Sequence, residues 1–301
     1  MMDSEIARHE GKQHDSGYII LSVILTVVFA FAMGINALAG AGTDIGWFKN
    51  DTGDISDAYY LEITPNGWAF SIWGIIYTWL IIGIILILIS ICIKNQSGPV
   101  YLNPPIISRL FLIFYILDMG FNIAWLFLWD RQYMPWALAV FLAYDVLLYA
   151  MLFDHHRRLD RHLKYMQENH RVSLVLNRVI IQNGVALHGT WITIATLINL
   201  GVVVTYTAGA PQPTASTISL AILTCEVLAY FVLENFIWEK YLRYTFSVWP
   251  VVIWALSASI DGNWDPEKVN SIFSAVLLAL ATVFLITKIV LSVIRCRTSP
   301  L

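Results

Sequence analysis

Four acidic side chains lie inside long apolar stretches of this sequence. They are Asp118, Asp145, Glu226 and Glu234. An ionised carboxylate in a hydrocarbon environment costs about 3 kcal/mol, so such residues typically form an ion pathway or pair with other polar groups. Two interpretations therefore stay open: a proton or cation path, and structural pairing, for which Arg178 and Lys288 are the basic candidates.

Aromatic and polar side chains recur at helical spacing in other apolar stretches, and this pattern indicates a small-molecule site. The candidates are Trp68, Phe70, Trp73, Tyr77, Asn122, Trp125, Trp136, His188, Trp191, Ala195 and Asn199. Residues three or four apart share one helix face. Aromatic rings bury large flat surfaces, and a few amide or imidazole groups orient a ligand by hydrogen bonding. The alternative is that the amides join neighbouring helices and the tryptophans lie at membrane interfaces.

A histidine cluster runs through His155, His156, His162 and His170. Membrane di-iron enzymes need several such clusters from different helices, and this one is embedded among arginines, so we expect a solvated loop near lipid headgroups and assign no metal. No hydrolase, nucleotide-binding or dinucleotide-binding motif stands in a plausible context. We therefore expect a protein that is not an enzyme.

These residues must be positioned by membrane-spanning helices. Of the 301 residues, 58% are hydrophobic and 13% charged, and the mean hydropathy is +0.66. A spanning helix needs about 20 apolar residues. Eight stretches fit this length approximately, which predicts an all-α polytopic bundle. They are Tyr18 to Ala39, Trp68 to Ile93, Ile107 to Trp129, Tyr133 to Phe153, Gly184 to Tyr206, Ala215 to Trp238, Thr245 to Ile260 and Val269 to Ile294.

The distribution of basic residues predicts that both chain ends are cytosolic. Cytoplasmic loops collect Lys and Arg. With the N-terminus inside, thirteen basic residues fall in cytosolic segments and three in external loops. The thirteen are Arg8, Lys12, Lys94, Arg109, Arg157, Arg158, Arg161, Lys164, Arg171, Lys240, Arg243, Arg295 and Arg297, and the three are Lys49, Arg131 and Lys268. The sequon at Asn50 then lies outside, which favours a secretory-pathway or plasma membrane over a mitochondrial one. The absence of a basic excess argues against nucleic acid as a partner.

Three motifs in the first five predicted spans resemble the TspO/MBR family, the tryptophan-rich sensory proteins and translocator proteins. The first runs from Pro65 to Phe70 and continues to Trp73 and Tyr77. The second is Phe121-Asn122 with Trp125, followed by Trp136-Ala137-Leu138. The third is Trp191, Ala195 and Asn199. The first motif is one residue short and lacks the family's Gly-Pro before its second tryptophan, so the chain resembles a distant branch.

The resemblance implies a five-helix bundle with an aromatic-lined cavity for a flat hydrophobic ligand, such as a tetrapyrrole, a sterol or an aromatic compound. We expect a cytosolic tail over residues 1–17, the five-span bundle over 18–207, three additional spans over 208–295 and a second tail over 296–301. Members of the family often dimerise, so the resemblance also implies that the protein can form a homodimer, although the sequence specifies no interface. The expected function is binding, transport or sensing of such a ligand among membrane lipids, and the alternative is a proton- or ion-coupled transporter that uses the four intramembrane carboxylates.

Overall fold

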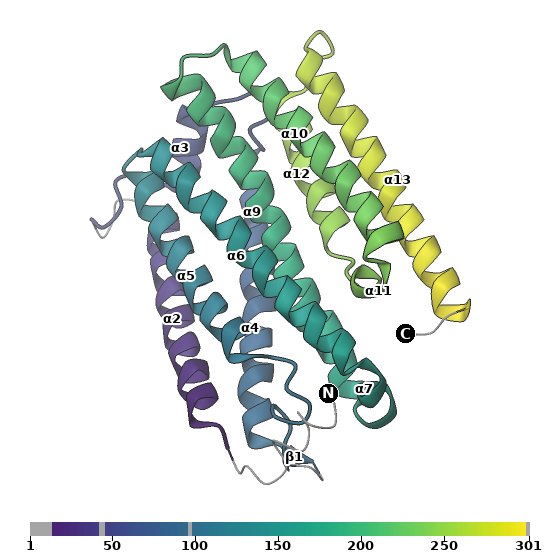
Figure 1. The fold of residues 1–301 in the computed structure, drawn as a ribbon. Coiled ribbons are helices and arrows are strands. Elements are labelled where there is room, and N and C mark those ends of the chain that lie inside the picture. The colour runs from purple at the N-terminus through teal and green to yellow at the C-terminus, as the bar shows by residue number, and fades with distance from the viewer. Residues whose placement is uncertain (1–13, 42–45, 96–97, 299–301) are drawn as a thin grey trace.

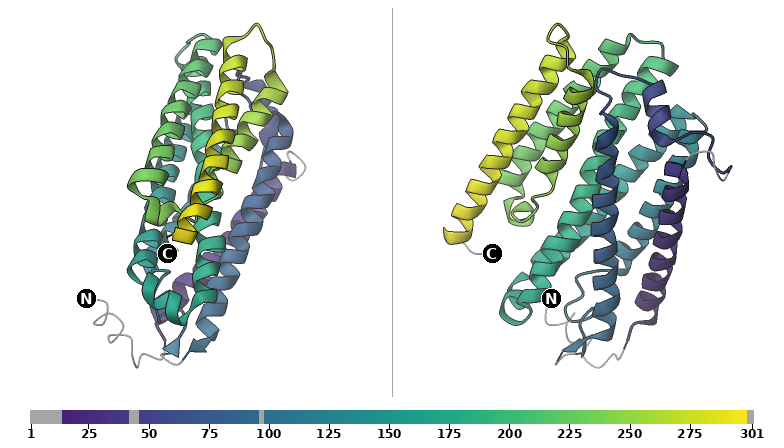
Figure 2. Two further views of the ribbon diagram at one scale, coloured as in Figure 1. Left: turned by 90° about the vertical axis from the view of Figure 1, so that its right-hand side faces the viewer. Right: turned by 180° about the vertical axis from the view of Figure 1, so that it is seen from behind.

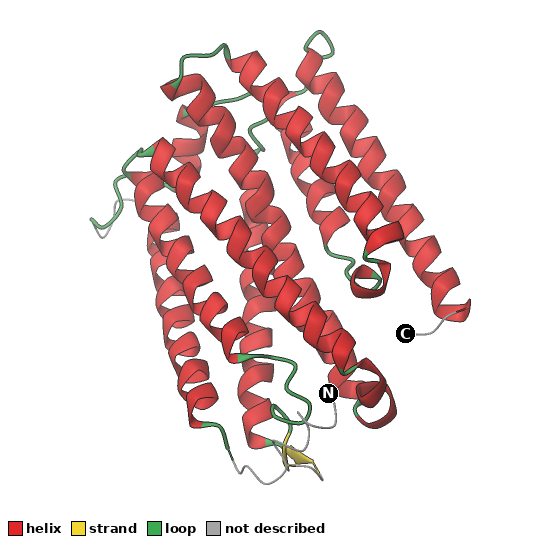
Figure 3. Ribbon diagram, in the orientation of Figure 1, coloured by secondary structure: helices red, strands yellow, loops and turns green. Residues whose placement is uncertain are grey.

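The computed structural model describes residues 14–41, 46–95 and 98–298, and almost all of them are helical (Figure 3). The long helices are α2 (Ser16–Ala41), α4 (Ile72–Cys92), α5 (Arg109–Asp130), α6 (Met134–Arg161), α9 (Asn183–Val202), α10 (Gln212–Val232), α12 (Val248–Asn263) and α13 (Val269–Thr298). Shorter helices are α3 (Thr52–Ala58), η2 (Gly67–Ser71), α7 (Leu163–Asn169), α8 (Arg171–Leu176) and α11 (Glu239–Leu242). Residues Lys94–Asn95 (β1) pair antiparallel with Gly98–Pro99 (β2).

Seven helices among the described residues are long and apolar enough to cross a membrane. The seventh predicted span, Thr245 to Ile260, corresponds to α12, which has 16 residues and is not among the seven. At 1.5 Å per residue it measures roughly 24 Å, less than the hydrocarbon thickness of about 30 Å. It nevertheless runs alongside the other helices, so α2 begins and α13 ends at the same end of the bundle (Figure 1). We refer to the two ends by the short helices there, as the α3 end and the α7 end.

The first five long helices close into a ring. Each packs against two neighbours, in the order α2, α4, α9, α6, α5 and back to α2. Of the remaining helices, α10 and α12 each pack against both α9 and α13, and the three form a second group beside the ring (Figures 1 and 2). Helix α9 thus belongs to both groups, and it is the most buried of the spans.

Three π-helical segments modify the long helices. These are η3 (Asn177–Gln182) before α9, η4 (Val203–Thr207) after it, and η5 (Leu233–Ile237) after α10. The polar stretch before the fifth predicted span therefore belongs to the same continuous helix, which runs over Arg171–Thr207. A π-helical turn adds a residue and rotates the side chains that follow it.

Candidate functional site

The ring interior is a dense aromatic and polar core. The side chain of Asn36 donates to Asn122 Oδ1 at 2.7 Å, and Tyr77 donates to Asn36 Oδ1 at 2.6 Å. Trp73 stacks on Tyr77 with ring centroids 5.3 Å apart. These contacts join α2, α4 and α5. Asn122, Tyr77 and Trp73 are thus brought together, as the helical spacing suggested.

The predicted residues of α9 face the same core. His188 and Trp191 meet Trp73 edge-on at 5.9 and 6.4 Å. His188 is fully buried, and its Nε2 lies 2.9 Å from the hydroxyl of Tyr144. Its Nδ1 lies 3.7 Å from Asp118, which is also fully buried. The ring interior is therefore filled by contacts among these protein side chains.

The other predicted binding residues lie outside this group. Trp125 stacks between Phe141 and Trp129. Asn199 is buried nearer the α3 end of α9, whereas Trp136 is 68% exposed at the start of α6. Phe70 and Ala195 are half-buried.

Trp68 joins the two helix groups. Its indole nitrogen donates to Asp261 of α12 at 2.9 Å, and its ring meets Trp254 of α12 edge-on. Asn66 donates to the same carboxylate, and Asn263 donates to the carbonyl of Thr64. The Pro65-to-Phe70 segment therefore holds α12 against the ring.

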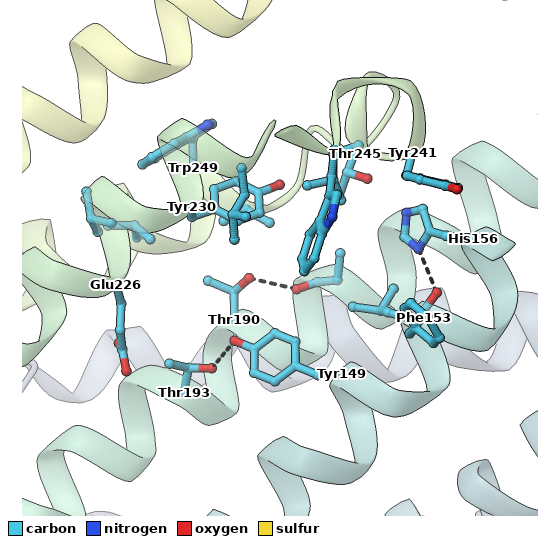
Figure 4. Close-up of a pocket in the computed structure, with 18 of the residues that line it drawn as sticks. Tyr149, Phe153, His156, Thr190, Thr193, Glu226, Tyr230, Tyr241, Thr245 and Trp249 are labelled. Carbon is cyan, nitrogen blue, oxygen red and sulfur yellow. Dashed lines mark hydrogen bonds between the residues drawn. The ribbon is translucent and has the colours of Figure 1, made fainter. Parts of the chain in front are cut away.

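A cavity of about 690 Å³ lies between the two helix groups (Figure 4). Helix α9 contributes Thr190 and Thr193, and α6 and α10 line the two sides. Both of these helices pack on α9, and they lie to either side of it (Figure 1). We call this cavity the groove. It is lined by Tyr149, Leu152, Phe153, His156, Arg157, Ala186, Thr190, Thr193, Ile194, Leu223, Glu226, Val227, Tyr230, Leu233, Trp238, Tyr241, Leu242, Thr245, Val248, Trp249 and Val252.

None of the eleven predicted binding residues lines the groove. Its surface is mainly apolar and aromatic, with hydroxyl groups that are largely paired with protein atoms. Tyr149 and Thr193 share a hydrogen bond of 2.6 Å, and Thr190 donates to the carbonyl of Ala186. Such a surface suits a hydrophobic molecule, because the bound molecule would cover few polar groups that lack a partner in the protein.

The α7 end of the groove is covered by α11. Lys240 of this helix forms an ion pair with Asp160 of α6 at 3.0 Å. Arg243 donates to Glu239 at 2.5 Å. Burial acts to raise the pKa of Glu239, but the hydrogen bond and charge of Arg243, with the charge of Arg295, lower this pKa below its usual value. Glu239 is therefore ionised, and in this form it pairs with Arg243, the residue that follows α11.

The four intramembrane carboxylates occupy three separate places. Asp118 lies in the ring interior. Asp145 lies beside the groove and accepts hydrogen bonds from Thr193 and Thr196. Glu226 lines the groove. Glu234 is fully buried and pairs with Lys288 at 3.1 Å, which is one of the two partners considered from the sequence.

Glu226 and Glu234 have different surroundings, although they lie eight residues apart on one continuous helical stretch. Glu226 lines the groove, whereas Glu234 accepts from Trp249 of α12 and pairs with α13. Glu234 lies in the π-helical segment η5, which continues α10.

The expectation of a solvated histidine loop was wrong. His155 and His156 lie within α6, which continues eight residues beyond the predicted span end at Phe153, and they are 0% and 8% exposed. His162, which follows α6, is 1% exposed. The apolar pattern ends near Phe153, but the helix does not, because its later turns pack against the connection before α5 and the helices after α6.

A bundle of apolar helices with its ionisable groups turned inward defines a multi-pass integral membrane protein of the α-helical class. The family model for TSPO-like proteins matches residues 22–290, and the chain belongs to this family. The match extends from α2 into α13, so it includes the three helices that follow the ring. No individual curated protein and no solved structure matched the chain in the corresponding comparisons.

Sequence reasoning missed Asn36 and Tyr144 in the ring and most residues of the groove. Asn36 had a readable signal, since it is an amide inside an apolar span. The groove residues had none, because threonines and aromatics in spans are ordinary and their convergence depends on how the two helix groups pack.

Proposed function

We propose that this protein binds a flat hydrophobic small molecule within the membrane, and that the molecule occupies the groove. The observation that carries the proposal is the cavity of about 690 Å³ with its mainly apolar and aromatic surface. Small-molecule sites typically measure roughly 300 to 1,000 Å³ and combine such surfaces with a few polar groups. Tetrapyrroles, sterols and synthetic aromatic compounds are the candidate ligands.

The groove is a better candidate than the ring interior. Trp73, Tyr77, His188 and Trp191 contact each other in the ring, so a ligand there would have to separate packed side chains. In the groove a ligand would instead cover apolar surface that the protein leaves open. Several lining residues are at least half-exposed, including Tyr149 and Phe153.

Two adjacent residues of α9 allow the two sites to be compared. Thr190 faces the groove, and Trp191 faces Trp73 in the ring. We expect Thr190→Phe, which fills the groove, to weaken binding of protoporphyrin IX or cholesterol at least tenfold, and Trp191→Ala to change it less than threefold. Equilibrium binding to protein in nanodiscs, monitored through the fluorescence of the porphyrin or of a fluorescent sterol, measures both.

Thermal unfolding of the two variants controls for general loss of structure. Binding that is lost in Trp191→Ala and kept in Thr190→Phe would overturn the groove proposal and favour the ring. Absence of saturable binding in the wild type would overturn the proposed function itself.

A second candidate function is proton- or ion-coupled transport. The observation that favours it is that Glu226 lines the groove and lies close enough to Asp145 for their charges to repel. It predicts pH-dependent flux in liposomes that Glu226→Gln abolishes. Flux that is the same in this variant and the wild type would refute it.

We also propose that the α7 end faces the cytosol. Arg157, Arg158, Arg161 and Lys164 lie at that end, and a lysine and arginine excess marks the cytoplasmic side. In a secretory-pathway membrane, Asn50 would then be glycosylated. A shift in the electrophoretic mobility of the protein after glycosidase treatment tests this.

A further inference from the structure

His156 is a buried polar side chain of the groove with an unused nitrogen. It lies on α6 one turn beyond Leu152, and 8% of it is exposed (Figure 4). Its Nδ1 lies 2.6 Å from the carbonyl oxygen of Leu152. Its Nε2 is buried and has no hydrogen-bond partner among the described residues.

The contact with Leu152 determines which nitrogen carries the proton. A carbonyl oxygen only accepts, so Nδ1 must be the donor, and in the neutral ring Nε2 is then an acceptor. A second proton on Nε2 would place a charge in a buried site, and no ion pair joins His156 to a carboxylate of the described chain. His156 therefore presents a lone pair that needs a donor.

The other polar groups of the groove are mostly used by the protein. Tyr149 and Thr193 bond to each other, and Thr245 accepts from Gln182 at 2.6 Å. The hydroxyl of Tyr230 has no partner, but it can act as donor or acceptor and so selects no ligand chemistry. Among the buried side chains that line the groove in the described part of the chain, His156 is the one whose unpaired atom specifies a donor.

We infer that the occupant of the groove is a hydrophobic alcohol whose hydroxyl donates to Nε2 of His156. Its hydrocarbon body lies along Phe153, Tyr230 and Trp249, towards Thr193. This inference rests on the proposed function and narrows its ligand class. A carboxylate or an ether oxygen cannot donate to Nε2, so acidic tetrapyrroles are disfavoured relative to neutral alcohols.

The position of His156 along α6 agrees with this orientation. Five residues separate it from the helix end at Arg161, which corresponds to roughly 7 Å. The hydroxyl would then lie near the membrane surface and the hydrocarbon deeper, as for any alcohol in a bilayer leaflet. Sterols, diacylglycerols and long-chain isoprenoid alcohols share this chemistry.

Retinol, retinyl methyl ether and retinoic acid share one hydrocarbon skeleton and differ in the head group, so they test the inference. Energy transfer from Trp238 and Trp249, which line the groove, reports binding to the purified protein in nanodiscs. We expect the wild type to bind retinol about tenfold more tightly than the ether, because the ether leaves the buried acceptor unpaired; this ratio corresponds to about 1.4 kcal/mol. Retinoic acid, measured at a pH at which its carboxyl group is ionised and has no proton to donate, should bind no better than the ether.

His156→Phe should remove the preference by weakening retinol binding to the level of the ether, with ether binding unchanged. The matched control is His170→Phe, since His170 packs against Tyr165 beyond the groove and this variant should keep the preference. If His156→Phe does not fold, the comparison of alcohol and ether on the wild type still decides the question.

Equal affinity of the wild type for retinol and its ether, or a preference that survives in His156→Phe, would overturn the inference. Failure of the proposed function gives a different result, because Thr190→Phe would then weaken the binding of none of the three probes. Repeating the comparison of free alcohol and methyl ether with cholesterol and with a diacylglycerol shows which of these lipid alcohols the groove binds.

Discussion

The ion pair between Glu234 and Lys288 makes a quantitative prediction about the helices that follow the ring. The two side chains are 0% and 2% exposed and lie 3.1 Å apart. Glu234 also accepts from Trp249 at 2.7 Å, and Lys288 donates to the carbonyl of Leu242 at 2.8 Å. The pair therefore connects η5, α12 and α13 with the last residue of α11.

Removing one partner leaves the other charge buried without compensation, which typically costs about 3 to 5 kcal/mol. Both Lys288→Met and Glu234→Gln should destabilise the protein by this amount. The double variant removes both charges and keeps an acceptor for Trp249. Its remaining cost is that of leaving the Leu242 carbonyl and the introduced amide N–H group to find new partners, about 1 to 3 kcal/mol. The coupling between the two sites should therefore be about 3 kcal/mol or more.

Thermal or denaturant-induced unfolding in nanodiscs measures the three variants against the wild type. The double variant should be more stable than either single variant. Additive losses, with the double variant the least stable of the three, would show that the two charges do not compensate each other and would refute the reasoning.

Three further predictions concern other contacts of the fold. Gly184→Ala should destabilise the protein by about 1 to 3 kcal/mol, because its new Cβ would lie 2.8 Å from the ring of Trp79. The control is Gly189→Ala, whose new Cβ would have its nearest neighbour 3.7 Å away. Thermal unfolding should show this control to be neutral or stabilising. Asp261→Ala should cost about 1 to 2 kcal/mol by removing the acceptor for Trp68, and adding Trp68→Phe should cost little more, which a double-mutant cycle checks. Glu239→Gln should lower the melting temperature at pH 7. The pKa of Glu239 is lowered in the folded protein, so its contribution to stability is present above about pH 4.5 and is lost as the pH falls through that folded pKa. The difference in melting temperature between the variant and the wild type should therefore shrink with acidification. A difference that stays constant with pH would contradict this prediction.

The sequence predicted the fold class and the family resemblance because both depend on strong local patterns. Runs of about 20 apolar residues specify spans whatever their neighbours are. Residues such as Trp73, Tyr77 and Trp191 recur at helical spacing, and the structure brings them together in the ring. The full extent of α6 was not predicted, because its polar end is buried by contacts that are distant in sequence.

The groove could not be predicted for a similar reason. It exists because α6 and α10 both pack on α9 and so flank it, a property of the whole bundle. Trp68 illustrates the same limit: its motif matched the resemblance, but its indole contacts Asp261, nearly two hundred residues later. The histidines were misjudged because a neighbouring arginine predicts exposure only where no other helix covers the site.

Photoaffinity labelling tests most directly whether the groove binds a hydrophobic molecule. The protein in nanodiscs would be irradiated with a photoreactive cholesterol analogue, with and without excess cholesterol, and the labelled residues identified by mass spectrometry. We predict competable labelling of groove residues such as Phe153, Tyr230 and Trp249, and its loss in Thr190→Phe. Competable labelling of Trp73 or Trp191 instead would contradict the account and place the ligand inside the ring.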